Sequence, residues 1–345
     1  MKINFNLFEA MTSAEALFTA WFAFRKGKMQ RPDVLNYWRH LERNIFRLQE
    51  ALLTKKYHHS PYKSFYIHDP KLRHIRKARV EDRIVHQAVY SVLALIYEPI
   101  FIDHVYSSRV GKGTHRAVNQ LRAKIRKIKG KSSDVWSLKC DIRKFYDSVD
   151  RDILIGILSK SLPDEDALWL MKEIIASFHT DGRPGKGVPI GNLTSQIFAN
   201  IYLNELDQFV KHGLKVKHYL RYADDLLFLS SNKNELLEIL PKVKQFLGEA
   251  LSLELHPQKI ILRPLKQGID FLGYVTLPHH RRLRTTTERR MIRRLSENLD
   301  LYFKDKLTDD SFNQSLQSYL GILSHADAHR LQETMKDHFS KRLMR

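Results

Sequence analysis

The sequence predicts an α+β fold in which helical segments flank a central group of strands. Residues from about 9 to 56 carry apolar side chains at three- and four-residue spacing, and helical patterns return after Pro278. Between these regions, runs at 64–67, 135–141 and 219–229 are rich in aromatic and aliphatic residues and read as strands. With 345 residues, the chain is long enough for two or three compact subdomains.

The charge balance favours a polyanionic partner. The chain has 58 Lys and Arg against 38 Asp and Glu, which gives a net charge of +20, and nucleic acid is the first candidate. An anionic membrane surface is the alternative, but no apolar run approaches the ~20 residues that a membrane span needs. No secretory signal opens the chain, so we expect a soluble, cytoplasmic protein without a membrane partner. The single cysteine, Cys140, excludes a disulfide framework and a Cys-based zinc site.

The N-terminal elements are predicted in the following order. An apolar stripe, expected to pack on a core, is formed by Leu35, Trp38, Leu41, Ile45, Leu48 and Leu52. A strand at 64–67 leads into 71–76, where alternating cations would lie on one face of an extended segment. A helix then runs from Glu81 to about Ile96.

Two further segments are strongly basic. Residues 111–131 combine a glycine-rich start with a cationic helix, which is either a solvated face or a contact to a nucleic-acid backbone. The chain after Pro278 is again basic and then helical to the end. We expect its arginines to follow the backbone of a bound nucleic acid: Arg281, Arg282, Arg284, Arg289, Arg290, Arg293 and Arg294.

The chemistry is expected to centre on three carboxylates. Asp224 and Asp225 interrupt an apolar run, so a hairpin with both acids at its tip is predicted. Asp141 ends the strand at 135–141, and it reaches that tip if the two strands are neighbours in one sheet. An Asp–Asp turn taken alone is more often a solvated loop. Three converging carboxylates, however, suit two Mg²⁺ ions and in-line phosphoryl transfer.

A loop between these elements is a candidate nucleotide pocket. The segment 187–196 contains glycines that allow a ligand to approach the backbone, and Ser and Thr residues open the helix that follows at 197–206. Read alone, this segment would be an ordinary loop and helix cap.

Five segments in one order resemble the motifs of reverse transcriptases, over about residues 60–280. They are 141–150, 187–196, 221–225, 256–259 and 271–274. The resemblance implies a right-hand polymerase with fingers, a palm of antiparallel sheet plus helices, and a short helical thumb. The expected boundaries are an N-terminal helical region at 1–60, fingers at 61–135, palm at 136–278 with a residual fingers insertion around 160–190, and thumb at 279–345.

The same resemblance implies roles for individual residues in RNA-directed DNA synthesis with dNTPs. Asp141, Asp224 and Asp225 would bind two Mg²⁺ ions, with Mn²⁺ as a substitute, and Lys259 would protonate the pyrophosphate. Tyr146 resembles the steric gate against a ribose 2′-hydroxyl. Arg73 resembles the residue that grips the triphosphate, with Lys71 and Arg76 as weaker candidates. The remaining positions are Ile190, Gly191 and Gln196 in the nucleotide pocket, and Phe271, Leu272, Gly273 and Tyr274 as the primer grip.

Ile190 and Gln196 replace the first and last residues of the Gln-Gly-x-x-x-Ser-Pro motif that many relatives carry. In this the chain resembles the enzymes of diversity-generating retroelements, which make error-prone cDNA from a template-repeat RNA. Segments 111–115 and 318–326 also suit that group. The resemblance implies template RNA, nascent cDNA and a basic oligomeric accessory protein as partners. A retron enzyme fits less well because Leu277, not Gly, follows Val275-Thr276. A group II intron protein is expected to be longer, with maturase or endonuclease extensions.

Two alternatives remain open from the sequence. One is a related bacterial reverse transcriptase of antiviral defence, which would share the motifs but serve another purpose. The other is a non-enzymatic RNA-binding scaffold with the same fold, against which the complete set of three aspartates argues.

Overall fold

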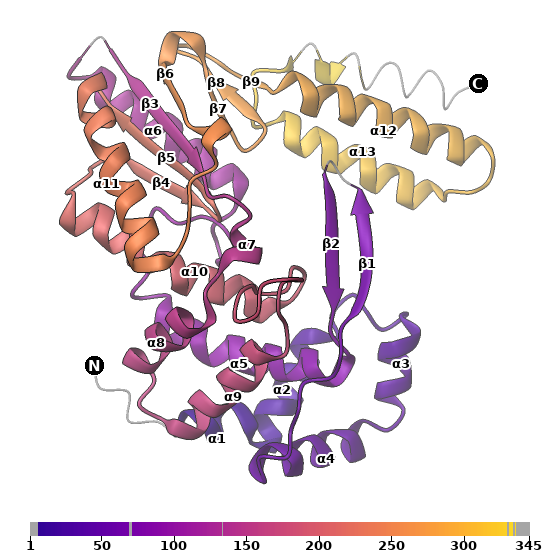
Figure 1. Cartoon of the computed structure of the whole chain (residues 1–345). Helices are drawn as coiled ribbons and strands as arrows, with labels where there is room; N and C mark the ends of the chain where they lie inside the picture. Colours follow the sequence, from indigo (N-terminus) through magenta and orange to yellow (C-terminus); the bar gives the residue numbers. More distant parts are fainter. Residues whose placement is uncertain (1–5, 69–70, 133, 330, 334, 336–345) are drawn as a thin grey trace. The chain divides into compact units, whose positions relative to one another are not determined.

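The structure, a computed structural model, describes residues 6–68, 71–132, 134–329, 331–333 and 335 (Figure 1). The chain forms two compact units. The first unit comprises 1–111, 140–226 and 239–259, and the second comprises 112–139, 227–238 and 260–345. Helices and antiparallel sheets occur together, which confirms the predicted α+β class.

The first unit is mainly helical. Helix α5 is central to it, because α1, α2 and α10 all pack against α5, and α5 extends over Val80–Tyr97 as predicted. Ten residues of α5 and twelve of α10 are buried, so both helices belong to the core. The other helices of this unit are α1 Leu7–Thr12, α2 Ala14–Phe24, α3 Pro32–Trp38, α4 Leu41–Leu53, α7 Phe145–Ser148, α8 Arg151–Ser161, α9 Glu165–Ala176 and α10 Leu193–Gln208, followed by a π-helical turn, Phe209–Gly213, and a 3₁₀ turn, Pro257–Lys259.

The predicted apolar stripe near the N-terminus is partly wrong. The helix ends at Trp38 and a new one starts at Leu41, so the three- and four-residue period does not continue across the break. His40, with φ −128° and ψ 35°, leaves the helical conformation at this point. Trp38 is therefore 48% exposed, and Val34 and Tyr37 are buried on α3 in its place.

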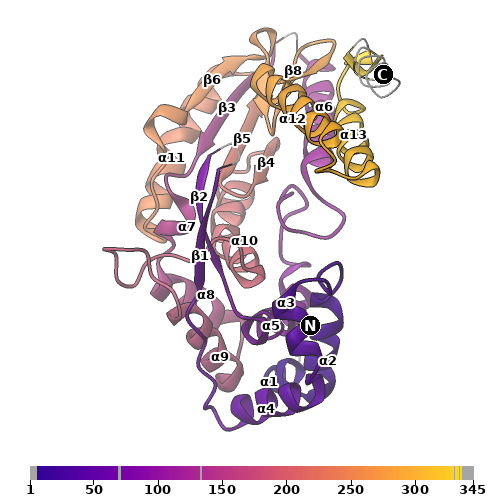
Figure 2. The same ribbon diagram turned by 90° about the vertical axis from the view of Figure 1, so that its right-hand side faces the viewer.

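A two-stranded hairpin follows the helical cluster. Strands β1, Lys63–His68, and β2, Leu72–Lys77, pair antiparallel with Phe65 opposite Ile75. Both views show the hairpin extending away from helices α1–α5 (Figures 1 and 2). Its side chains are largely exposed, including the aromatic Tyr66, which stacks on His74 with ring centroids 4.3 Å apart. The predicted strand at 64–67 and extended segment at 71–76 are confirmed.

The central sheet has four strands in the order β4-β5-β3-β6. The strands are β3 Trp136–Asp141, β4 Tyr219–Tyr222, β5 Asp225–Ser230 and β6 Ile261–Pro264, and β3 pairs antiparallel with β6. Strands β4 and β5 are hydrogen-bonded neighbours joined by Ala223 and Asp224, so the predicted hairpin is confirmed. The strand that ends at Asp141 lies directly beside β5, as the convergence of the carboxylates requires.

The second unit contains a smaller antiparallel sheet, β7-β8-β9, and several helices. Its elements are α6 Thr114–Lys129, a 3₁₀ turn Leu265–Gln267, β7 Ile269–Phe271, β8 Tyr274–Thr276, β9 Arg281–Leu283, α12 Thr285–Phe303 and α13 Asp309–Leu323. Helix α11, Lys233–Leu251, is divided between the two units. His115 of α6 stacks on His325, with ring centroids 3.8 Å apart, so segments 111–115 and 318–326 meet.

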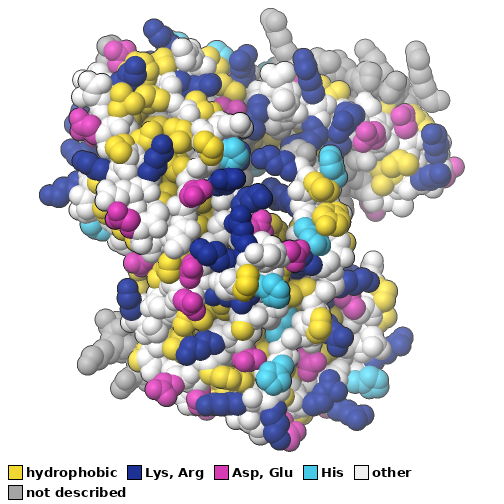
Figure 3. All heavy atoms as spheres, in the orientation of Figure 1, with side chains coloured by type: hydrophobic (Ala, Val, Ile, Leu, Met, Phe, Trp, Pro, Cys, Tyr) yellow, Lys and Arg dark blue, Asp and Glu magenta, His cyan; other side chains and the backbone are white. Residues whose placement is uncertain are grey.

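The surface carries the positive surplus of the sequence. Lys and Arg side chains are spread over the face drawn in Figure 3, interspersed with acidic and hydrophobic ones. In the part of the chain that the structure describes, no helix combines the length and the apolar character that crossing a bilayer requires.

Candidate active site

The carboxylates meet where β3 ends and the β4–β5 hairpin turns. The backbone N–H of Ile142, the residue after Asp141, donates to the carbonyl oxygen of Asp224 at 3.2 Å. Ala223 has a φ of 51°, the left-handed conformation that tightens the turn before Asp224. The end of β3 is therefore hydrogen-bonded through its backbone to the turn of the β4–β5 hairpin.

These acids influence one another electrostatically. Burial, together with the negative charges of Asp141 and Asp225, raises the pKa of Asp224 to about 6, and Lys259 acts in the opposite direction. The Lys259 ammonium lies 2.5 Å from Oδ1 of Asp141. The Lys259 loop is held to the same strand end, because the N–H of His256 donates to the carbonyl of Asp141 at 2.7 Å. The structure thus brings together all four residues predicted to take part in catalysis.

The donor set fits a divalent cation in its chemistry. Among the residues that the structure describes, no three His, Cys, Asp or Glu side chains are grouped closely enough to form a ready metal cluster. The mutual repulsion that raises the pKa of Asp224 is nevertheless the kind that a divalent ion relieves, and hard carboxylate oxygens suit Mg²⁺. Asp141, Asp224 and Asp225 would hold the ion, which supplies charge stabilisation for phosphoryl transfer.

The β4–β5 hairpin is stabilised by a buried ion pair that the sequence did not lead us to expect. Arg221 and Asp207 have fully buried side chains and are joined by three nitrogen–oxygen contacts of 2.6–3.0 Å. Tyr219 also donates to Asp207, at 2.9 Å, and Arg221 donates to Asn200 and to the carbonyl of Ala223. The signal in the sequence that could have revealed this ion pair is Arg221, because a charged side chain within a buried strand requires a partner of opposite charge.

Tyr146 lies beside the carboxylates on helix α7. Burial raises the pKa of its phenol, the charge of Asp224 raises it further, and Arg73 and Arg221 act in the opposite direction. Tyr146, Asp224 and Arg73 are therefore within electrostatic range of one another. The carbonyl of Tyr146 accepts a hydrogen bond from the N–H of Val188 at 2.8 Å, which fixes this segment to the predicted nucleotide loop.

The nucleotide loop is hydrogen-bonded to strand β2. The N–H of Arg76 donates to the carbonyl of Ile190 at 3.1 Å, and the side chain of Asn192 donates to the carbonyl of Arg76 at 2.9 Å. Gly191 has a φ of 108°, and a Cβ there would lie 2.9 Å from Ile75, so only glycine fits. Ile190 is half-buried.

A cavity of about 380 Å³ opens beside this loop. Gly191, Asn192 and Gln196 line it, together with side chains from α2, β2 and α5. The Oδ1 atom of Asn192 is buried without a hydrogen-bond partner in the described structure. The three cations predicted to bind the triphosphate have different surroundings. Lys71 and Arg73 are exposed, whereas the guanidinium of Arg76 donates a hydrogen bond to the hydroxyl of Ser64 at 2.6 Å.

The predicted nucleic-acid residues fall in the second unit. Phe271 and Tyr274 are buried, and the turn between them places Leu272 at φ 52° and Gly273 at φ 87°. The hydroxyl of Tyr274 donates to the carbonyl of Ile322 at 3.0 Å. These positions form the tight β7–β8 turn, with the backbone of Leu272 and Gly273 at its tip.

The seven predicted arginines do not share one exposed face. Arg281 is buried and donates to Asn119 at 2.9 Å, and Arg284 is paired with Asp270. Arg290 and Arg294 are half-buried. The exposed arginines are Arg282, Arg289 and Arg293.

Comparison with known families defines the class of this protein. The model described as "Reverse transcriptase (RNA-dependent DNA polymerase)" matches residues 67–276, more than half of the chain. The chain therefore belongs to the reverse transcriptase family, whose members are nucleotidyltransferases that generally use divalent metal ions and dNTPs. The match includes all five motif segments, and it leaves out the first residues of β1 and the basic C-terminal region.

Two curated relatives indicate the neighbourhood within that family. The group II intron-encoded protein LtrA of Lactococcus lactis is 24% identical over 302 residues, covering 68% of this chain and 49% of its own length. Protein YkfC of Escherichia coli K12 is 24% identical over 265 residues, covering 66% of this chain and 69% of its own. The chain thus spans about half the length of the intron-encoded relative.

Solved structures show the same fold. Apo telomerase from Candida tropicalis superposes with a TM-score of 0.56 at 14% identity, over 83% of this chain and 59% of that one. Telomerase from Candida albicans, in complex with a fragment of telomeric RNA, gives a TM-score of 0.51 at 12% identity, over 79% and 56%. The fold of a right-hand polymerase, expected from the motifs, agrees with these neighbours.

Proposed function

We propose that this chain is an RNA-directed DNA polymerase. It uses Asp141, Asp224 and Asp225 to bind two Mg²⁺ ions, and its substrates are dNTPs. The observation that carries the proposal is the backbone tie between Ile142 and Asp224 within the family match, which keeps the carboxylates together. Lys259, beside Asp141, would donate a proton to the leaving pyrophosphate. Template RNA and nascent cDNA are its nucleic-acid partners.

Primer extension by the purified full chain tests this proposal. A labelled DNA primer on an RNA template should be extended with dNTPs and Mg²⁺, and an Asp224→Asn/Asp225→Asn variant should extend nothing detectable. RNA binding should be retained in that variant, because cations on the protein supply most of the affinity. Synthesis by the double variant at the wild-type rate would exclude these residues as the metal ligands, and RNA binding without synthesis by the wild type would favour the scaffold alternative.

Within this activity, we propose error-prone synthesis from a template-repeat RNA of a diversity-generating retroelement, aided by a basic oligomeric accessory protein. Ile190 and Gln196 in the nucleotide loop support this subtype. Sequencing of cDNA made with RNA from the flanking genomic region tests it, since errors concentrated at template adenines are expected. Accurate copying would favour the related reverse transcriptase of antiviral defence.

A second candidate function follows from the relatives. The similarity to LtrA covers 68% of this chain, and that protein is encoded by a group II intron. An intron-associated reverse transcriptase would bind its own intron RNA far more tightly than unrelated RNA of the same length. Filter binding with both RNAs separates this candidate from the retroelement enzyme.

A further inference from the structure

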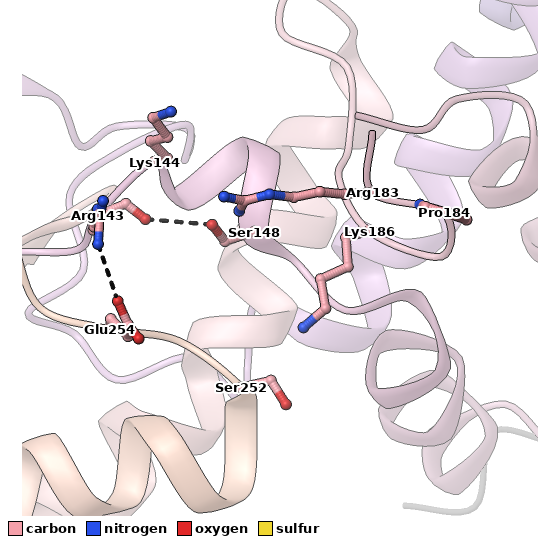
Figure 4. A pocket seen from close by; sticks show the side chains of 8 residues that line it. All are labelled: Arg143, Lys144, Ser148, Arg183, Pro184, Lys186, Ser252 and Glu254. Atoms are coloured by element: carbon pink, nitrogen blue, oxygen red, sulfur yellow. Dashed lines mark hydrogen bonds and ion pairs between the residues drawn. The ribbon is translucent and has the colours of Figure 1, made fainter. Parts of the chain in front are cut away.

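The first unit contains a charged cavity in addition to the carboxylate site and the cavity beside the nucleotide loop. Its volume is about 500 Å³, and its lining combines four cations, one carboxylate and two serines (Figure 4). The cations are Arg143, Lys144, Arg183 and Lys186. None of these residues belongs to the motif positions assigned above to metal, nucleotide or primer.

Two of the four cations lie beside an acidic side chain. Arg143 is 3.4 Å from Glu254, and Lys186 is 3.5 Å from Asp150, so these pairs are neutral overall. Within the described part of the chain, Lys144 and Arg183 make no side-chain ion pair. The cavity therefore keeps a surplus of two positive charges on side chains that are exposed.

The walls of the cavity are held in place before any ligand arrives. One wall is the loop that carries Arg183, which points toward Ser148 and the segment of Arg143 in Figure 4. The backbone of this loop bonds to that segment through three N–H groups: Arg151 to Gly185 at 3.1 Å, Gly187 to Val149 at 2.8 Å and Val188 to Tyr146 at 2.8 Å. A preformed site loses little entropy when a ligand binds.

The lining also limits the chemistry of the ligand. No aromatic ring lines the cavity, and Pro184 is its one apolar lining residue, so a base would find no stacking surface. Guanidinium, ammonium and hydroxyl groups instead match the oxygens of phosphate. We propose that this cavity is a phosphate-binding site separate from the carboxylate cluster. Its ligand is either a polyphosphate, such as the pyrophosphate product, or the backbone of a nucleic-acid strand.

The test removes only the two unpaired charges. A Lys144→Gln/Arg183→Gln variant of the full chain is compared with Lys172→Gln/Lys217→Gln, which removes two exposed lysines elsewhere in the same unit. Calorimetric titration with pyrophosphate and tripolyphosphate, without nucleic acid, forms one arm. Anisotropy of labelled single-stranded RNA across a KCl series forms the other.

We expect the cavity variant to bind about tenfold more weakly than the control variant in at least one arm, the effect of a lost charged hydrogen bond. If the ligand is a nucleic-acid strand, the slope of log affinity against log salt should become shallower by about 0.7 for each lost phosphate contact. Loss in the calorimetric arm alone identifies a free polyphosphate. Equal binding by the two variants in both arms overturns the proposal.

A charge-preserving variant guards against a trivial loss of structure. Lys144→Arg/Arg183→Lys keeps both charges and should keep most of the binding, whereas equal weakness of this variant and the glutamine variant would overturn a phosphate site. Neither arm requires DNA synthesis. The failure of this inference and the failure of the proposed polymerase activity are therefore distinguishable.

Discussion

Tyr146 lies within electrostatic range of Asp224 and Arg73, where a ring could exclude a ribose 2′-hydroxyl. We predict that Tyr146→Ala admits ribonucleotides while keeping part of the deoxynucleotide activity. Tyr146→Phe is the matched control, because it retains the ring and should retain the discrimination. Single-nucleotide insertion with dNTPs and rNTPs measures both variants. Equal loss of both activities in Tyr146→Ala would indicate that the ring serves packing alone.

Ile190 offers an apolar surface where an amide could make hydrogen bonds. Discrimination by apolar shape reaches only ~1–3 kcal/mol, or roughly ten- to two-hundred-fold, so frequent errors are expected. Ile190→Gln should lower the ratio of wrong to right insertion, most strongly opposite template adenine. Ile153→Gln, a half-buried isoleucine of α8, is the matched control and should leave the ratio unchanged. A change in rate at a constant ratio would place the source of errors elsewhere.

At the scale of single residues, the sequence predicted what its local pattern encodes. Asp141 ends β3, Asp224 lies in the turn of the β4–β5 hairpin and Asp225 begins β5, so their positions could be read directly. Asp207 stands on a helix, and only the folded chain shows that it neutralises Arg221. Arg281 resembles its basic neighbours in sequence, but packing in the second unit buries it.

At the scale of the elements, the Asp207–Arg221 pair joins helix α10 to strand β4. Replacing Asp207 with Asn leaves the buried guanidinium without a counter-charge, and this should lower the free energy of unfolding by about 3–5 kcal/mol. The control is Asp166→Asn, which breaks a surface pair with Lys55 whose partners are about half exposed and should cost about 0–1 kcal/mol. Urea denaturation measures both. Similar losses would contradict a supporting role for the buried pair.

Helix α12 and the strand before it present three exposed arginines, Arg282, Arg289 and Arg293. If they contact the template–primer backbone, replacing all three with Gln should weaken binding to unrelated sequences equally. The salt dependence should flatten by roughly 0.7 to 0.9 log units for each lost contact. Binding assays on duplexes of different sequence measure this. An unchanged slope would make these arginines an ordinary solvated surface.

At the scale of the whole molecule, a buried histidine makes stability depend on pH. Burial, together with the nearby His59 and Arg83, lowers the pKa of His86 to about 3. The unfolded chain binds a proton to this histidine below its ordinary pKa of about 6.5, whereas the folded chain does not. The contribution of neutral His86 to the free energy of unfolding is therefore fully present above pH 6.5, and it is lost as the pH decreases from 6.5 toward 3.

His86→Gln tests this dependence, because an amide can keep the contact with the Nε2 atom of His59, which lies 3.1 Å away, without titrating. Thermal unfolding between pH 7 and pH 5 should show a smaller decrease in this variant than in the wild type. His58→Gln removes a histidine that is 80% exposed and should leave the decrease unchanged. Equal pH dependence of all three proteins would contradict a buried neutral His86.

The parts of the fold that could be predicted are those whose interacting residues lie close together in the sequence. Helix α5 and the β4–β5 hairpin follow from periodicity and a short turn, and both occur where predicted. The break between α3 and α4 could not be predicted, because no Gly or Pro marks residues 39 and 40. The adjacency of β3, which ends at Asp141, and β5, which begins at Asp225, required the motif order in addition to local pattern, because the two strands are far apart in the sequence.

The single cysteine has a practical consequence for solution studies. Cys140 is completely buried in β3, and burial raises the pKa of its thiol to about 12, so little reactive thiolate forms at neutral pH. Ellman's reagent should therefore react with none of the native chain and with one thiol per chain after denaturation. A fluorophore-accepting cysteine introduced at Val110, which is 89% exposed, would be labelled alone. The wild-type chain thus serves as its own thiol-free background for site-specific fluorescence experiments.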